Sequence, residues 1–223
     1  FEKLNITSQT QGSDAAGAKL LSATQTLDLM VDSFGESAEI SIGFNSDLPR
    51  PEVFAPELEA LQGLSIQGDL KATADGDTLT LTTADLDVAS KGANVVSVKL
   101  KQSLNLGTEQ NFSGELMDVD LMNLPMAWIN PWLGEGTELS GAPLSAQIAL
   151  SGQSDGGLRV VTRQPIVIGP ISMMRGEYPL LDNVTVRLNP VFQVDADGKF
   201  SYDLGEFELL DRYGAVVVGA VSG

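Results

Sequence analysis

Apolar and polar residues alternate along most of the chain, which is the pattern of a β-strand with one apolar and one polar face. Leucines alternate with threonines in TLTLTT (78–83), and apolar residues alternate with acids in DLDVAS (85–90). The same spacing of two recurs in VVSVKL (95–100), QIALSG (147–152) and DNVTVRL (182–188). The pattern predicts an all-β protein.

Turn sequences separate these segments at short, regular intervals. They are ADGDT (74–78), SKGAN (90–94), SDGG (154–157) and DADGK (195–199), and each places glycine where a hairpin turn requires a positive φ. Short strands with such turns predict an antiparallel meander. We expect one face of the sheet to carry Leu79, Leu81, Leu86, Val88, Val96, Val98 and Leu100.

One stretch, NLPMAWINPWLGEG (123–136), breaks the alternation and contains both tryptophans. We expect 124–133 to be a short apolar helix that packs on the concave, apolar side of the sheet at one end, as a lid on the core and secondarily as a gate. The inward-facing residues would be Trp128, Ile129, Trp132 and Leu133, with Asn130 and Glu135 in water. The segment 50–61 would be its counterpart.

The two helical segments belong to a longer repeated pattern. Residues 44–72 and 119–146 share the order strand, Leu-Pro, apolar helix, short loop, glycine and strand. We therefore expect one elongated β-domain over 1–223, a fragment of a longer chain, with repeat units at about 36–110 and 111–223.

Composition narrows the function. The chain has 13 Lys+Arg against 30 Asp+Glu, a net charge of -17, which argues against nucleic acid and against electrostatic adhesion to anionic lipid. It has no Cys and no His, which removes thiolate nucleophiles, disulfides, His bases and nearly all zinc sites. No run approaches about 20 apolar residues, so we expect no segment of this chain to span a bilayer.

The remaining motifs have structural explanations. DADG (195–198) resembles a calcium loop, but the first and twelfth ligand positions would be Gln193 and Leu204, which cannot serve. Most carboxylates alternate with apolar residues, as Asp85 and Asp87 flank Leu86, which is typical of a solvated strand face. We expect no enzymatic activity, no metal and no cofactor.

Three segments resemble the AsmA-like and TamB-like envelope proteins of Gram-negative bacteria. The first is LSIQGDLKATADGDTLTLTTADLDVASKGANVVSVKL (64–100), and the second is MDVDLMNLPMAWINPWLGEGTELSGAPLSA (117–146). The third is GEYPLLDNVTVRLNP (176–190), followed by GEFELLDRYGAVVVGAVSG (205–223). Members of that family are commonly much longer than this chain.

The resemblance implies an extended antiparallel sheet curled into an open, β-taco-like groove in the periplasm. Such a groove shelters or conducts phospholipid acyl chains between the inner and outer membranes, and a segment absent from this chain would tether the protein to the inner membrane. The residues expected to line the groove are Ile66, Leu70, Leu79, Leu81, Leu86, Val88, Val96, Val98, Leu100, Ile148, Leu150, Val184, Val186 and Leu188.

Two other functions remain open from the sequence. One is a structural or adhesive β-repeat domain whose apolar faces close into a core without a ligand. The other is an outer-membrane protein assembly factor that acts on client strands through exposed sheet edges. A groove lining and a closed core have the same composition, so the apolar residues do not separate these alternatives.

Overall fold

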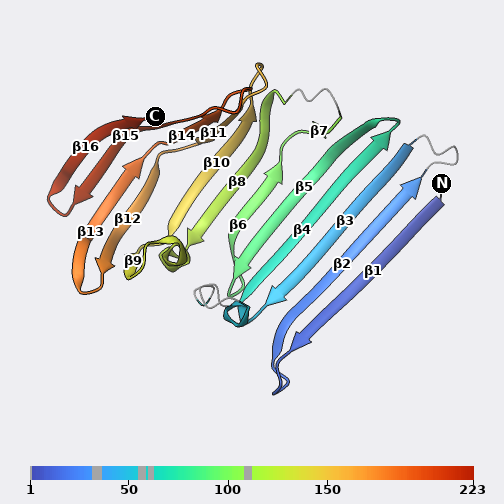
Figure 1. Ribbon diagram of the computed structural model, residues 1–223, viewed down its shortest axis with the longest axis horizontal. Helices are drawn as coiled ribbons and strands as arrows, with labels where there is room; N and C mark the ends of the chain where they lie inside the picture. Colours follow the sequence, from blue (N-terminus) through green and yellow to red (C-terminus); the bar gives the residue numbers. More distant parts are fainter. Residues whose placement is uncertain (1, 32–36, 55–58, 60–62, 108–111) are drawn as a thin grey trace. The chain divides into compact units, whose positions relative to one another are not determined.

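The computed structural model confirms the all-β prediction (Figure 1). It describes the whole chain except residues 1, 32–36, 55–58, 60–62 and 108–111. Contacts within the chain define two compact units, Phe1–Asp118 and Val119–Gly223, which are described separately. The repeat units expected at 36–110 and 111–223 stay a prediction. In the described part of the chain, no helix has the length and apolar character needed to cross a membrane.

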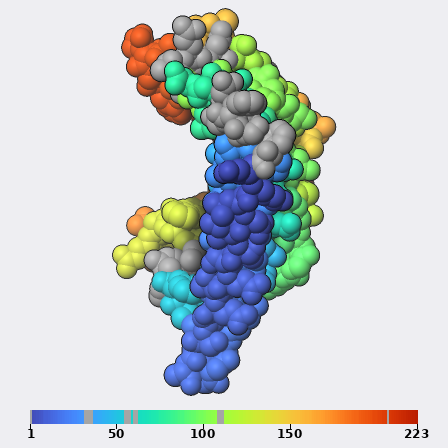
Figure 2. Space-filling model, turned by 90° about the vertical axis from the view of Figure 1, so that its right-hand side faces the viewer, coloured from blue at the N-terminus to red at the C-terminus, as the bar shows by residue number. Residues whose placement is uncertain are grey.

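The first unit is an antiparallel meander in which each strand pairs with the next along the chain. Figure 2 looks onto β1, in blue, which pairs only with β2 among the described strands. The strands are β1 (Glu2–Ser13), β2 (Lys19–Val31), β3 (Ser37–Leu48), β4 (Leu64–Asp75), β5 (Thr78–Ser90), β6 (Ala93–Leu100) and the two-residue β7 (Leu104–Asn105), which pairs with β5.

The predicted turns lie where the sequence placed them. The β5–β6 turn contains Lys91 at φ 51° and Gly92 at φ 79°, two consecutive positive values that match the right-handed twist of the flanking strands. Gly76, at φ 54°, makes the β4–β5 turn. The other two predicted turns join β10 to β11 and β14 to β15 in the second unit.

A bulge places the leucines of β5 on a common face. Leu79 and Leu81 occupy odd positions, whereas Leu86 and Val88 occupy even ones, so strict alternation would put the two pairs on opposite faces. Lys71 lies opposite Thr83 and Ala72 opposite Leu81, which leaves Thr82 as an unopposed extra residue. The bulge therefore reverses the alternation between the two pairs.

The expectation for this face is confirmed. Through β4, Leu79 and Leu81 lie opposite Ala74 and Ala72, on the same face as Ile66, which is opposite Val88. Val88 in turn pairs with Val96, and Leu86 with Val98, and alternation along β6 puts Leu100 on this face as well.

The second unit contains the C-terminal part of β8 (Gly114–Leu124), where the chain passes from the first unit into the second. Its strand order is β8, β10, β11, β14, β15, β13, β12, β9, and β16 pairs with β15. These strands are β9 (Thr137–Gly141), β10 (Leu144–Gly152), β11 (Leu158–Thr162), β12 (Ile166–Arg175), β13 (Tyr178–Leu188), β14 (Val191–Val194), β15 (Phe200–Asp211) and β16 (Gly214–Ser222).

Three prolines divide this sheet into two branches. Pro143, Pro165 and Pro190 lie at the β9–β10, β11–β12 and β13–β14 junctions, where a missing backbone N–H interrupts a strand. After each break the set of neighbouring strands changes, although β13 and β14 both pair with β15. One branch is β10–β11–β14 and the other is β9–β12–β13, and β15 joins them because its two ends pair with β14 and β13.

Short 3₁₀ turns cover the β9–β12–β13 branch. The expected helix at 124–133 consists of η3 (Met126–Trp128) and η4 (Asn130–Trp132), because Pro131 prevents one continuous helix. Met126 is buried with Leu139 of β9 and Ile171 of β12. This cluster is the core of the branch, and Ile129 and Leu133 pack against it as expected.

Two expectations for this segment are wrong. Trp132 is 82% exposed, because the interruption at Pro131 removes the helical spacing that would put it beside Trp128. Trp128 is only half-buried, although its Nε1 is enclosed. Asn130 does not stay in water, because its Oδ1 accepts a hydrogen bond of 2.8 Å from the backbone N of Leu139. Glu135 is exposed as expected.

The expected counterpart at 50–61 lies partly outside the described residues. The described part forms the 3₁₀ turn η1 (Pro51–Val53), whose Pro51 is fully buried. In neither unit does the sheet close or curl strongly, so the strongly curled groove expected from the sequence is not present within either unit.

Candidate functional site

The candidate site is one face of the β1–β6 sheet, here called the apolar face. Residues directly opposite each other in neighbouring strands point to the same side, so the pairing defines rows that cross the sheet. One row is Ile6, Leu27, Ile42, Leu70 and Ala84. The next is Leu4, Leu29, Ile40, Ala72 and Leu81.

The apolar rows continue toward the β5–β6 end of the face. Phe44, Leu86 and Val98 form one row with Gly68, and Ile66, Val88 and Val96 form the next. A row at the other end contains Val31, Ala38, Ala74 and Leu79. Nine of the residues predicted to line a groove thus meet on this face, namely Ile66, Leu70, Leu79, Leu81, Leu86, Val88, Val96, Val98 and Leu100.

Almost all charge lies on the opposite face, here called the polar face. Glu2, in the first strand position, is the single charged residue of strands β1–β6 that shares the apolar face by register. The charged residues on the polar face are Lys3, Lys19, Asp28, Glu39, Asp47, Asp69, Lys71, Asp75, Asp85, Asp87 and Lys99. Acids exceed bases there by seven to four.

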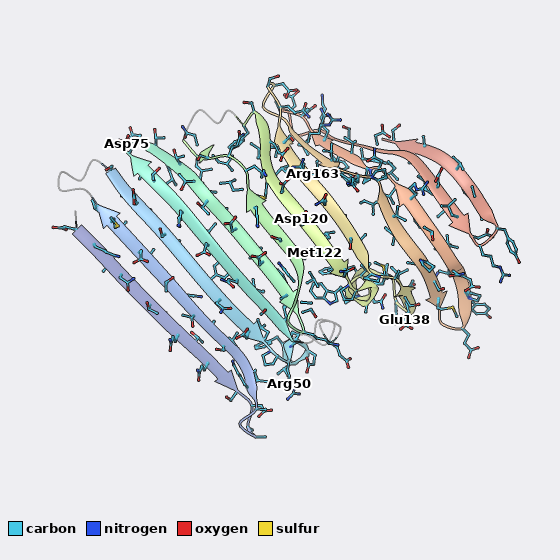
Figure 3. The ribbon with its side chains drawn as sticks, turned by 180° about the vertical axis from the view of Figure 1, so that it is seen from behind. Arg50, Asp75, Asp120, Met122, Glu138 and Arg163 are labelled. Atoms are coloured by element: carbon cyan, nitrogen blue, oxygen red, sulfur yellow. The ribbon has the colours of Figure 1, made fainter. Side chains whose placement is uncertain are left out.

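The apolar face is a single layer that its own strands leave open. Ile6 is 48% exposed, Ile42 39%, Leu70 37% and Leu79 38%. Side chains of this kind in a packed core are almost fully buried. Figure 3 shows the side chains along these strands, between Asp75 at one end of the sheet and Arg50 at the other. The apolar face is therefore an exposed surface within the described first unit.

Phe44 fills the gap that Gly68 leaves on this face. Gly68 lacks a side chain, and a Cβ built there would overlap the ring of Phe44, which lies over the glycine. The backbone O of Asp85 would lie 3.0 Å from the same Cβ. The ring thus packs against bare backbone at a site where a glycine would otherwise weaken the strand.

On the polar face, hydrogen bonds hold Asp87 in its charged form. The pKa of Asp87 is lowered below its ordinary value of 3.8, first by the Ser97 hydroxyl and then by the Asn94 amide, while burial opposes the shift and Lys99 supports it. Asn94 Nδ2 donates to Asp87 Oδ1 at 3.1 Å. Ion pairs such as Lys3–Asp28 (3.8 Å) and Lys19–Asp47 (3.9 Å) are solvent-exposed and contribute little stability.

The predicted lining residues of the second unit do not join one surface there. Ile148 and Leu150 share a face with Val160, which lies opposite Leu150. This face continues to a stack of three aromatic rings, in which neighbouring ring centroids are 6.2 Å apart. The stacked residues are Phe192, Phe200 and Tyr202. Val184, Val186 and Leu188 lie in the other branch. Val186 packs against the Met126 cluster beneath the 3₁₀ turns, so it belongs to a covered core.

The sequence analysis missed the contribution of β1–β3. Leu4, Ile6, Leu27, Leu29, Ile40, Ile42 and Phe44 extend the apolar face across three more strands. The alternation ISIGF at 40–44 carries the signal for β3. In β1 the apolar residues occupy only two positions among polar ones, which is too few to identify a face.

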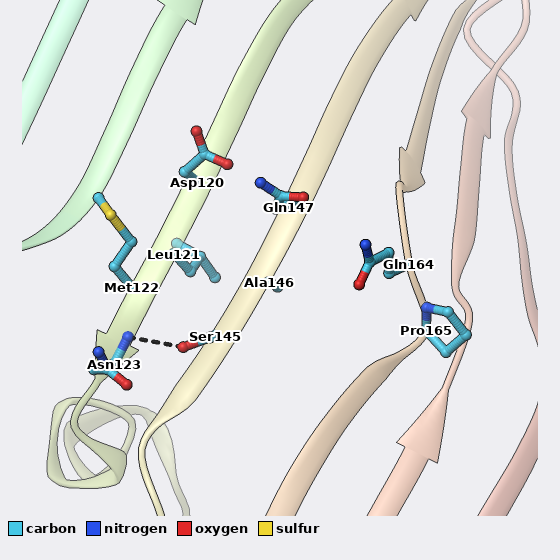
Figure 4. Close-up of a pocket in the computed structure, with 9 residues that line it drawn as sticks. All are labelled: Asp120, Leu121, Met122, Asn123, Ser145, Ala146, Gln147, Gln164 and Pro165. Atoms are coloured by element: carbon cyan, nitrogen blue, oxygen red, sulfur yellow. Dashed lines mark hydrogen bonds between the residues drawn. The ribbon is translucent and has the colours of Figure 1, made fainter.

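A hollow in the second unit is lined by both polar and apolar side chains (Figure 4). It has a volume of about 450 Å³ and lies beside the β11–β12 break at Pro165. Its polar groups come from Asp120, Asn123, Ser145, Gln147 and Gln164, and Ser145 Oγ accepts a 2.9 Å hydrogen bond from Asn123 N. Amides, a hydroxyl and one carboxylate in such a hollow can hydrogen-bond a polar ligand.

No group of three or more acidic residues in the described part of the chain could hold a metal ion. Comparisons with protein-family models, curated proteins and solved structures gave no match to this chain. The assignment of function therefore depends on the chemistry of the apolar face and on the resemblance of the three sequence segments.

Proposed function

We propose that this chain is a non-enzymatic module that holds phospholipid acyl chains on the apolar face of its first unit. The observation that carries the proposal is the separation of side chains by the sheet, with aliphatic residues exposed on one face and the charged residues of β2–β6 on the other. An alkyl chain binds by displacing water from apolar area, and it requires no charge and no hydrogen-bond partner.

The size of the face supports this ligand class. The two widest apolar rows cross five strands, roughly 19 Å at about 4.8 Å spacing, and the five rows together span roughly 27 Å along the strands. The resulting patch, at most roughly 500 Å², is comparable with the largest apolar patch on a typical soluble monomer, about 300–600 Å², and such patches are often functional.

The finer part of the proposal follows the resemblance to the AsmA-like and TamB-like proteins. The open face would curl around its ligand as a groove, and lipid would pass along it through the periplasm between inner and outer membranes. A segment outside this chain would provide the tether to the inner membrane. Nothing in this function requires catalysis, a cofactor or a metal.

A closed structural core is the second candidate, and it is favoured only in the second unit. There η3 and η4 cover the β9–β12–β13 branch, and Met126, Leu139 and Ile171 are buried beneath them. The apolar side chains of this branch therefore already have partners within the chain, unlike Ile42 or Leu70 of the first unit.

A photoreactive fatty acid tests the proposal directly. After crosslinking and proteolysis, mass spectrometry should locate the label on apolar-face residues such as Ile42, Leu70 and Leu86. Label on polar-face residues such as Ser41 and Lys71, or label that unlabelled fatty acid does not compete away, would contradict it.

A further inference from the structure

Three aromatic side chains of the second unit stand almost fully in water. Trp132 is 82% exposed, Tyr178 78% and Tyr213 82%. They are three of only five tryptophan and tyrosine residues in the chain. Each lies at a separate connection: η4, the β12–β13 hairpin and the β15–β16 hairpin.

Hydrogen bonds and strand register bring these connections to the same end of the unit. Gly176 N, in the β12–β13 hairpin, donates to Gly136 O, just after η4, at 2.9 Å. Arg175 lies opposite Thr137 in the β12–β9 pair. The β15–β16 hairpin lies at the same end of the unit as η3, η4 and the β12–β13 hairpin (Figure 1). It does not reach as far as the β12–β13 hairpin, because β15 pairs with β13 only from Thr185 to Arg187.

The third connection is tied to β13 by its side chains. Tyr213 and Arg212 share a hollow of about 210 Å³ with Asp182 and Asn183 of β13. The guanidinium carbon of Arg212 lies 4.8 Å from the centre of the Tyr213 ring, within the range of a cation–π contact. On β13 itself Leu180 is 52% exposed, which adds an aliphatic side chain near Tyr178.

Trp and Tyr are the residue types that prefer the boundary between lipid and water, because one end of each ring is apolar and the other can hydrogen-bond. On a soluble surface the same exposed rings contribute little to stability. The set of Trp132, Tyr178, Leu180 and Tyr213 is here called the aromatic tip.

The net negative charge around the aromatic tip favours a zwitterionic over an anionic lipid surface. Five acids lie on or next to the three connections, namely Glu135, Glu138, Glu177, Asp182 and Asp211, against two bases, Arg175 and Arg212. An anionic bilayer attracts clusters of lysine and arginine and would repel this surface. A zwitterionic bilayer carries no such penalty.

We propose that the aromatic tip docks on the interface of a zwitterionic phospholipid bilayer, with its rings at the level of the headgroups. The proposal concerns a surface of the second unit and does not depend on acyl chains binding to the apolar face of the first. A soluble fatty acid reports on the apolar face, and intact vesicles report on the aromatic tip, so either proposal can fail alone.

Tryptophan fluorescence tests the docking in the full chain. In a Trp128→Phe variant, Trp132 is the sole tryptophan, and phosphatidylcholine vesicles should shift its emission to shorter wavelength and protect it from a water-soluble quencher. An emission spectrum that vesicles leave unchanged would overturn the proposal.

Flotation with the same vesicles tests which residues are responsible. The triple variant Trp132→Ser, Tyr178→Ser, Tyr213→Ser should bind at least tenfold less, with an unchanged circular dichroism spectrum because all three side chains are exposed. Phe200→Ser is the matched control: Phe200 is 60% exposed but lies at the opposite end of β15. Equal binding by the triple variant, or stronger binding to phosphatidylglycerol than to phosphatidylcholine, would contradict the proposal.

Discussion

Both units are built from strands with alternating apolar and polar residues, but the apolar face is exposed in the first unit and covered in one branch of the second. In the first, Ile42 lies in the middle of the apolar face and is 39% exposed. In the second, Ile171 lies on the face that η3 and η4 cover and is 6% exposed. Alternation decides which side chains share a face, whereas a covering segment decides whether that face becomes a core.

The largest expected effect is the difference between these two isoleucines. Ile171→Ala removes buried methylene groups from a closed cluster and should destabilise the second unit by about 2–5 kcal/mol. Ile42→Ala removes a side chain that already contacts water and should cost about 1 kcal/mol or less. Hydrogen exchange measured by mass spectrometry resolves the stability of each unit separately. Equal losses of stability from the two substitutions would contradict the difference between an exposed and a covered face.

The sequence predicts some elements of the two units better than others. Alternation and turn residues predict the strands and the face shared by Leu79 and Val96. If Leu81 and Leu86 share that face, the change from an odd to an even position between them requires a bulge. The exposure of Trp132 was missed because helical spacing was assumed across Pro131.

The branching of the second sheet cannot be predicted from local sequence patterns. Pro143, Pro165 and Pro190 indicate where strands break, but not which strands pair with the segments on either side of each break. Those pairings connect residues far apart in sequence, such as Val161 with Val191 and Thr185 with Leu210, and hairpin signals do not encode them.

The packing of Phe44 over Gly68 gives the next largest effect. Gly68→Ala should push the ring aside and bring the new methyl group against the backbone O of Asp85, at a cost of about 1–3 kcal/mol. Phe44→Ala in the same chain should relieve part of that cost. Urea unfolding of the two single variants and the double variant measures the coupling, and additive losses would mean that the ring does not occupy the space above Gly68.

The smallest effect concerns Asp87 on the polar face. Its folded-state pKa lies below 3.8, so its charged form stabilises the first unit above pH 3.8, and this stabilisation is lost as the pH falls through the folded-state pKa. Asp87→Asn should therefore be less stable at pH 7, by less than about 1 kcal/mol because solvent screens the site. Unfolding curves at several pH values should show the difference disappearing in acid. A difference that grows below pH 3.8 would contradict this.

The central claim is that the apolar face of the first unit binds acyl chains, and a matched pair of variants in β3 tests it. Ile42 and Ser41 are neighbours on opposite faces of the same strand. Ile42→Glu places a charge in the middle of the apolar face, whereas Ser41→Glu adds the same charge to the polar face.

The measurement is the affinity of each variant for a fluorescent fatty acid, with circular dichroism to check the fold. Ile42→Glu should weaken binding at least tenfold, because an alkyl chain would have to displace water from a carboxylate. Ser41→Glu should bind like the unchanged chain. Equal affinities for the two variants, or no binding by the unchanged chain, would contradict the account.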